Sequence, residues 1–341
     1  MCSSDLNETR ALGRSDIRAL FHPAPGSIYL DTATYGLPPE PTVRAMSDAI
    51  AAWQAGSAHW KSDWDEPLEV TSALFADLIG APRGTIARIP QASVGTGLVA
   101  AGLGPGDEVV VPDDEFTSTL YPLLVAERRG ARIHQVPIDR LAESIGPRTT
   151  LVATSVVQMQ TGKMADLPAI LDRAAASGAR VLLDGTQSVP FVPLEAHLPR
   201  VDYLVCSGYK HLLCPRGASF LYVRQDRWDE LEPLNANWRA ADEPFGRYFG
   251  GPLHLAADAA RFDVSMGWIT WMGVMASLRL LLAWKAEGAL AGVVDLARDL
   301  AARSGVRHEG GTLVSVPTPD PVAAGAALED RKSTRLNSSH T

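Results

Sequence analysis

The chain has 341 residues, a formal net charge of −8 and 46% hydrophobic residues, which suits a globular protein with a large core. It has no basic tract of the kind that binds nucleic acid, no apolar run of about 18 residues and no signal-peptide pattern. Its cysteines (Cys2, Cys206 and Cys214) have neither metal-ligand nor disulfide-framework spacing. We therefore expect a cytoplasmic protein with no metal site, no nucleic-acid partner and no membrane segment.

Both ends of the chain differ in character from the rest. Residues 1–6 (MCSSDL) and 329–341 (EDRKSTRLNSSHT) resemble the translation of a sequencing adapter, so the fold prediction leaves them out. Between them we expect an amino-terminal segment over 7–27 and a large domain over 28–285. A smaller carboxyl-terminal domain is expected to begin over 286–328 and to be cut short.

Short apolar, β-branched runs alternate with helical patterns through the middle of the chain. The runs predict strands, buried on both faces, over 85–90, 107–112, 131–137, 149–157, 179–185, 201–207 and 218–224. Helical patterns cover 115–130 and 166–179, the second beginning at the capping residue Asp166 and ending at Gly178. This alternation predicts an α/β fold with a mostly parallel seven-stranded sheet sandwiched by helices.

The carboxyl-terminal part of this pattern changes. The connection 208–217 is too short for a helical crossover, so the last two strands are expected to be antiparallel. Two apolar stripes at helical spacing follow, over 276–288 and 290–305, and a further strand is expected over 311–317.

Two ionisable residues end neighbouring predicted strands. Asp184 ends the run VLLD, and Lys210 closely follows the run DYLVCS. Ligands of open α/β sheets bind at the carboxyl ends of strands, so both residues are expected at one crevice. A plain salt bridge between them is the alternative. Upstream, Ser93 and Val94 stand where a strand passes into a helix, and the free N–H groups of such a turn attract anions.

A phosphate-binding turn, a strand-end aspartate and a strand-end lysine together suit pyridoxal 5′-phosphate. The segments LLDGTQSV and CSGYKHLLCPRGASFLYVR resemble the signature of the class V aminotransferase-fold enzymes. That superfamily comprises aminotransferases, cysteine desulfurases, kynureninases and isopenicillin-epimerase-like proteins. The resemblance extends over most of the chain, from IYLDTATYGLPP to ARFDVSMGWITW. It implies fold type I of the pyridoxal-phosphate-dependent transferases and a homodimer with the active site near the interface.

The resemblance also implies roles for individual residues. Lys210 is similar to the Schiff-base lysine that later moves a proton at the substrate α-carbon, and Asp184 to the partner of the pyridine nitrogen. Gln187 corresponds to the residue that bonds the ring hydroxyl, and Phe116 to the residue that covers the ring. The remaining cofactor contacts that it implies are Ser93, Val94, Ser207 and Tyr209 at the phosphate and Gln158 at the cofactor edge.

Several other residues have simpler interpretations. Cys206 is predicted to be a core residue and His211 a structural one, pointing away from Lys210. The segment HWKSDW (59–64) either lines a substrate pocket or ends an amphipathic helix. Ser265 stands where the family often contacts phosphate across the subunit interface, but the usual Gly-Thr pattern is missing.

These features predict a pyridoxal-phosphate-dependent enzyme acting on an amino acid or another small amine, with transamination as the first interpretation. A lyase or desulfurase, or an epimerase, on the same fold is the alternative. A non-catalytic binding protein would be expected to have lost Lys210 or Asp184, and both are present. The carboxylate-binding arginine and any nucleophilic cysteine, which would separate these reactions, are expected beyond the apparent truncation.

Overall fold

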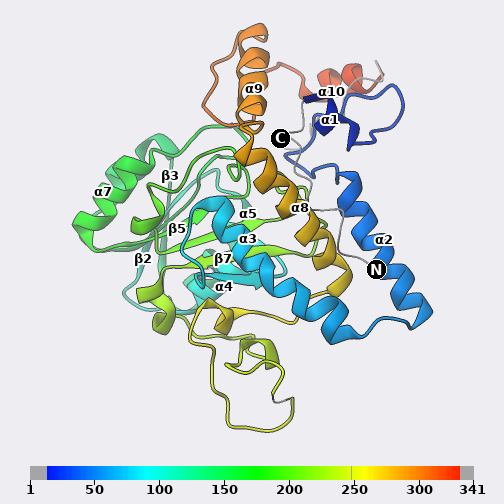
Figure 1. The fold of residues 1–341 in the computed structure, drawn as a ribbon. Coiled ribbons are helices and arrows are strands. Elements are labelled where there is room, and N and C mark those ends of the chain that lie inside the picture. Colours follow the sequence, from blue (N-terminus) through cyan, green and yellow to red (C-terminus); the bar gives the residue numbers. More distant parts are fainter. Residues whose placement is uncertain (1–13, 247, 331–341) are drawn as a thin grey trace.

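The computed structural model describes residues 14–246 and 248–330. The suspected foreign end 1–6 and most of the other, 329–341, lie outside the described residues. The described part contains a seven-stranded sheet with the strand order β1-β7-β6-β5-β4-β2-β3 (Figure 1). The strands are β1 Ile86–Ile89, β2 Glu108–Pro112, β3 Arg132–Val136, β4 Thr149–Ser155, β5 Arg180–Asp184, β6 Tyr203–Ser207 and β7 Ser219–Val223.

All seven strands predicted between 85 and 224 are present, and the direction of the last one is confirmed. The expected burial on both faces is wrong for β3, which lies at the edge of the sheet and is mostly exposed. Strand β7 pairs antiparallel with both β6 and β1, while β3, β2, β4, β5 and β6 form a parallel series. The loop between β6 and β7 therefore returns the chain at the same edge of the sheet, and it carries Lys210 there.

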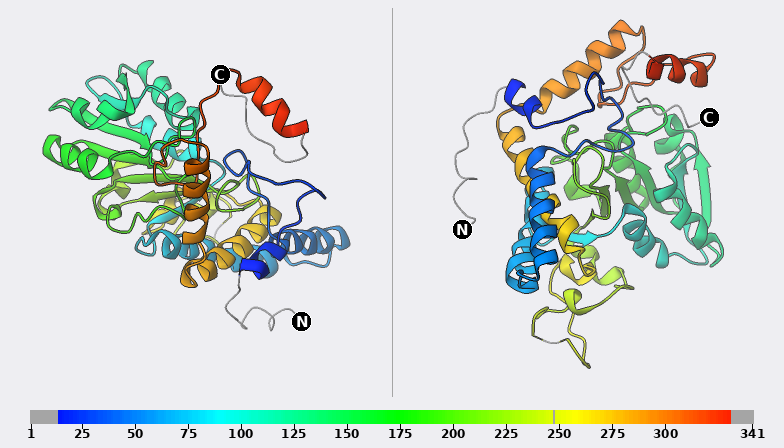
Figure 2. Two further views of the ribbon diagram at one scale, coloured as in Figure 1. Left: turned by 90° about the horizontal axis from the view of Figure 1, so that it is seen from above. Right: turned by 90° about the vertical axis from the view of Figure 1, so that its right-hand side faces the viewer.

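Helices cover both faces of this sheet (Figure 2). The helices are α1 Arg14–Ala19, α2 Glu40–Ala55, α3 Val70–Ile79, α4 Ala92–Ala101, α5 Thr117–Glu127, α6 Leu141–Ser144, α7 Leu167–Ser177, α8 Trp268–Ala286, α9 Ala291–Arg303 and α10 Pro321–Asp330. Successive strand residues point to opposite faces, so Leu183 joins the core beneath α3, α7 and α8, whereas Leu182 joins the core beneath α4 and α5.

Local sequence explains where these helices begin and end. At the start of α7 the Asp166 carboxylate accepts a hydrogen bond from the Ala169 N–H, 3.1 Å away, and the helix ends at Gly178 with φ 75°. The apolar stripe predicted over 276–288 belongs to the longer α8, which lies beside α2 (Figure 1). None of the described helices is long and apolar enough to span a bilayer.

The strand predicted over 311–317 is wrong. This segment has no regular secondary structure, and within 14–246 and 248–330 it pairs with no other strand. It packs instead against the loop that follows β4: a Cβ atom at Gly162 would lie 3.0 Å from the Leu313 carbonyl oxygen. The apolar pattern alone does not make a strand, because a strand also needs a neighbour to accept its backbone hydrogen bonds.

Candidate active site

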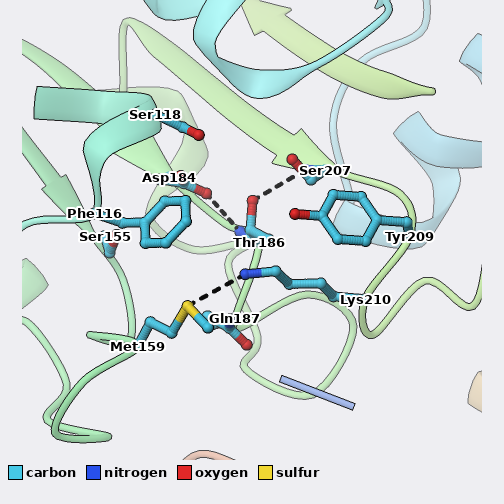
Figure 3. A pocket seen from close by; sticks show the side chains of 10 residues that line it. All are labelled: Phe116, Ser118, Ser155, Met159, Asp184, Thr186, Gln187, Ser207, Tyr209 and Lys210. Atoms are coloured by element: carbon cyan, nitrogen blue, oxygen red, sulfur yellow. Dashed lines mark hydrogen bonds between the residues drawn. The ribbon is translucent and has the colours of Figure 1, made fainter. Parts of the chain in front are cut away.

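A cavity lies where β4, β5 and β6 end at one edge of the sheet. Its volume is about 320 Å³ when the open solvent at its mouth is included (Figure 3). Register brings these ends together, because Ser155 of β4 pairs with Asp184 of β5, and Asp184 pairs with Val205 of β6. The lining residues are Phe116, Ser118, Ser155, Met159, Asp184, Thr186, Gln187, Ser207, Tyr209 and Lys210.

Lys210 projects into this cavity from the loop after β6 (Figure 3). Its side chain is 3% exposed, and Nζ lies 3.4 Å from the Met159 sulfur and 4.8 Å from the centre of the Phe116 ring. Burial lowers the pKa of Lys210 to about 8, although the nearby Asp184 opposes the shift. About a tenth of this amine is therefore uncharged at pH 7, far more than for an ordinary lysine, and an amine must be uncharged to be a nucleophile.

Asp184 lies at the end of β5 and is 4% exposed. Its carboxylate accepts hydrogen bonds from the Thr186 N–H at 2.8 Å and from the Thr119 hydroxyl at 3.3 Å. Burial raises the pKa of Asp184, while Thr186, Lys210 and Thr119 act against that shift. Within the described residues no ion pair joins Asp184 to Lys210, so the plain salt bridge considered from the sequence is not formed.

Gln187 follows Asp184 on the same loop and also lines the cavity. Its side-chain Nε2 donates to the Ala33 carbonyl at 3.0 Å, and its Oε1 faces His211 Nε2 at 2.9 Å. The segment around residue 33 is held close by Gly36, whose N–H donates to the Tyr209 carbonyl at 2.8 Å. A side chain at Gly36 would collide with the Lys210 carbonyl, so this close approach requires glycine.

Phe116 stands at the amino end of α5, and a buried carboxylate fixes its position. Glu115 accepts hydrogen bonds from the Phe116 N–H at 2.9 Å, from the N–H of Ser155 at 2.7 Å and from Gln158 Nε2 at 3.0 Å, and also from the Ser155 hydroxyl. Burial raises the pKa of Glu115, and these donors oppose that effect. The Glu115 carboxylate therefore ties the start of α5 to the end of β4.

Ser207 and Tyr209 line the opposite side of the cavity (Figure 3). The Ser207 N–H donates to the Thr186 hydroxyl at 3.0 Å, which links the end of β6 to the loop after β5. The Arg216 guanidinium lies 5.3 Å from the centre of the Tyr209 ring.

Three predicted cofactor residues do not line the cavity. Ser93 and Val94 are half-buried in the first turn of α4. That turn lies close to β6, because a Cβ atom at Gly95 would be 2.7 Å from Val205. Gln158 is fully buried, and its amide bonds Glu115. All three stay predictions.

The sequence interpretation missed several residues of the site. Thr119 and Thr186 bind the Asp184 carboxylate, while Ser155 and Met159 line the cavity. Thr186 lies within the quoted signature LLDGTQSV, so its position offered a signal. Thr119 is far from Asp184 in the chain, and no local pattern connects the two.

The other singled-out residues lie away from the cavity. Trp60 and Trp64 both stack against Trp268 and do not line it. Cys206 is fully buried, which confirms it as a core residue, and burial raises the pKa of the Cys214 thiol to about 12. Within the described residues no exposed, readily ionised thiol is present.

The donor set of the cavity fits pyridoxal 5′-phosphate. The fit rests on a buried lysine with no carboxylate bonded to it, a buried aspartate at the next strand end, and the Phe116 ring 4.8 Å from the lysine amine. Fold and site together define the class of pyridoxal-phosphate-dependent enzymes of fold type I.

Comparison with known proteins assigns the chain to a family within this class. The family described as aminotransferase class-V matches residues 28–245, and the chain belongs to it. The predicted fold class, enzyme class and cofactor are thereby confirmed.

Curated relatives carry several activities. The chain is 30% identical over 223 residues to a probable cysteine desulfurase of Methanothermobacter thermautotrophicus, covering 61% of this chain and 55% of the relative. It is 29% identical over 229 residues to the cysteine desulfurase CsdA of Escherichia coli, covering 60% and 56%. It is 31% identical over 187 residues to isopenicillin N epimerase of Streptomyces clavuligerus, covering 50% and 46%. The chain thus spans about half the length of these relatives.

Solved structures share the fold. The apo cysteine desulfurase of Thermococcus onnurineus NA1 superposes with a TM-score of 0.80 at 21% identity, covering 94% of this chain and 86% of that one. Escherichia coli CsdA superposes with a TM-score of 0.72 at 24% identity, covering 86% and 77%. At these identities the likeness concerns the architecture.

Proposed function

We propose that this chain carries the cofactor-binding part of an enzyme that uses pyridoxal phosphate to transform an amino acid or another small amine, with transamination as the first reaction to test. The observation that carries the proposal is the buried amine of Lys210, which has no ion pair with Asp184 and a pKa lowered to about 8. A buried charge without a partner is costly, so the presence of the Lys210 amine there favours a chemical role over a structural one.

Lys210 and Asp184 have different roles in this proposal. Lys210 would hold the cofactor through Nζ, and its amine would be placed to move a proton at the substrate α-carbon. Asp184, held by Thr119 and Thr186, would keep a proton on the ring nitrogen through a charge-assisted hydrogen bond. When bound, the cofactor supplies the electron sink for this chemistry.

The remaining residues hold and orient the ring. Phe116 would cover one face of the ring and exclude water, while Gln187 would bond the ring hydroxyl and Gln158 would act at the cofactor edge. Hydrogen bonds from Ser207 and Tyr209, and from the helix start at Ser93 and Val94, would hold the phosphate.

A second candidate is a desulfurase or carbon–sulfur lyase. The relatives favour it, since two of the three described above are named as desulfurases. Both described cysteines are buried, so a thiol nucleophile for that reaction would have to come from outside the described residues.

We also propose a cytoplasmic homodimer. Apolar side chains are exposed along α2, where Val43 is 47%, Ile50 45% and Trp53 64% exposed, and such a surface suits burial against a second copy. Light scattering of the purified chain tests this directly: a dimer mass is expected, and a monomer at micromolar concentration would contradict it.

The activity is tested with the purified chain loaded with pyridoxal phosphate. Amino acids are screened for keto-acid formation with a keto-acid acceptor, and cysteine for sulfide and alanine. We expect one of these products to form, and to be lost in Lys210→Ala. A product formed equally well by wild type and Lys210→Ala would overturn the proposal.

A further inference from the structure

The residue after Lys210 is a buried histidine that contacts the cavity wall. His211 is 5% exposed, and its ring packs edge-on against Phe191 with the ring centres 5.5 Å apart. The sequence interpretation gave it only a structural role. Its Nε2 instead lies 2.9 Å from Oε1 of Gln187, a residue that lines the cavity.

The hydrogen-bond pattern fixes which atoms donate. A carbonyl oxygen only accepts, so the Gln187 atom that lies 3.0 Å from the Ala33 carbonyl must be the amide nitrogen. The atom facing His211 is then the amide oxygen, which only accepts. His211 must therefore donate through Nε2–H.

The hydrogen bonds between His211, Gln187 and Ala33 leave one N–H of the Gln187 amide for a ligand. The Gln187 amide nitrogen carries two hydrogens and uses one on Ala33. Among the described residues its other hydrogen has no further partner. Because Gln187 lines the cavity, that hydrogen is available to a hydrogen-bond acceptor bound there.

The surroundings of His211 keep it a neutral donor. Burial, and then the nearby Lys210, lower the pKa of His211 to about 4. A neutral imidazole carries one N–H, and the contact with Gln187 places it on Nε2.

We propose that His211 is a positioning residue: its Nε2–H holds the Gln187 amide so that one N–H points into the cavity and donates to an ionised ring oxygen of the bound ligand. This inference rests on the proposed function, in which that oxygen belongs to pyridoxal phosphate. His211 itself does not touch the ligand; it acts by preventing Gln187 from rotating away or flipping its amide.

The test follows the visible absorption of the cofactor-loaded chain against pH. A donor to the ionised oxygen stabilises the deprotonated form of the chromophore, so losing the donor should raise the pH midpoint of the colour change. We expect Gln187→Ala and His211→Phe each to raise it by roughly half a unit to one unit, the size of one hydrogen bond. His211→Gln, which keeps an N–H at a similar distance, should restore most of the wild-type midpoint.

Two further variants separate positioning from packing. Phe191→Leu removes the ring that packs on His211 but leaves the hydrogen bond, so its midpoint should match wild type. In the double variant Gln187→Ala/His211→Phe, the midpoint should equal that of Gln187→Ala alone, because His211 acts only through Gln187. Should His211→Phe fail to fold, His211→Met replaces it, judged by circular dichroism.

The outcomes distinguish this inference from the proposed function. A shift in Gln187→Ala without one in His211→Phe would refute the role of His211 and leave the function intact. Additive shifts in the double variant, or an unrestored midpoint in a folded His211→Gln, would refute it as well. A wild-type chain that takes up no cofactor at Lys210 would instead refute the proposed function.

Discussion

Charged side chains are buried in two regions of this molecule, and they are partnered differently. In the first region, here called the ion-pair cluster (Asp65, Glu69, Arg88, Arg239 and Asp263), opposite charges meet directly. Arg88 Nε donates to Asp263 at 2.9 Å, and Arg239 Nη1 donates to Asp65 at 2.8 Å. Four of the five are almost fully buried; Glu69 is partly exposed.

The second region is the cavity, where Lys210 and Asp184 are just as buried but are not ion-paired with each other. Lys210 Nζ faces the Met159 sulfur and the Phe116 ring, while Asp184 is held by two threonines. The cluster uses its charges to join distant segments, and the cavity keeps its charges available. Burial alone therefore does not mark a functional charge; burial without an opposite partner does.

The largest expected difference concerns stability. Arg88→Ala leaves Asp263 buried and unpaired, so we expect a loss of about 3–5 kcal/mol in the free energy of unfolding. Lys210→Met removes an ammonium that has no carboxylate partner, and should leave the cofactor-free chain as stable as wild type or more so. Urea unfolding of the cofactor-free proteins measures both; equal destabilisation would remove the distinction between the two regions.

Enzyme activity, unlike stability, should depend mainly on the charged residues of the cavity. Asp184→Ala is expected to keep the cofactor bound but to lower turnover by at least about a hundredfold, since a charge-assisted hydrogen bond to the ring is lost. Visible absorption reports the bound cofactor, and the product assay reports turnover. Near-normal turnover in Asp184→Ala would exclude its role as the partner of the ring nitrogen.

Because Lys210 is buried without an ion pair, the stability of the cofactor-free chain should depend on pH. Its pKa in the folded chain is about 8, below the ordinary value of 10.5, so burial of the ammonium opposes folding at every pH below about 8. That cost declines as the pH rises from about 8 towards 10.5, and the stability of the cofactor-free wild type relative to Lys210→Met should rise over this window.

Chemical labelling checks the same pKa. Acetylation of the cofactor-free chain, followed by peptide mass analysis, should give Lys210 a reactivity midpoint near pH 8. Lys163 is the internal control, since its hydrogen bond to Asp139 raises its pKa and should place its midpoint higher. A shared midpoint for both lysines would show that the Lys210 amine is not perturbed.

A smaller effect is expected at the carboxylate behind Phe116. Glu115→Gln keeps the size of the side chain but turns an N–H towards donors that need an acceptor, so at least one hydrogen bond is lost. We expect cofactor affinity to fall about tenfold as Phe116 and Ser155 loosen. Fluorescence titration with pyridoxal phosphate measures this, with Glu127→Gln as an exposed control on α5; unchanged affinity would show that Glu115 only stabilises the fold.

Sequence patterns predicted the sheet well because buried strands are local features. Apolar, β-branched runs marked six of the seven strands clearly, whereas the exposed edge strand β3 also carries Arg132, His134 and Gln135. Asp184 and Lys210 could be placed at one crevice from their positions after strands. The segment 311–317 shows the limit, since an apolar run becomes a strand only where a neighbour pairs with it. The supporting contacts of the site, such as Thr119 with Asp184 or His211 with Gln187, join segments whose proximity depends on the whole fold.

The most direct test of the central claim is reduction of the pyridoxal-phosphate-loaded chain with borohydride, followed by peptide mapping. We predict that the visible absorption disappears and that the phosphopyridoxyl mass is fixed on Lys210. Label on another lysine, or equal labelling of Lys210→Ala, would contradict the assignment.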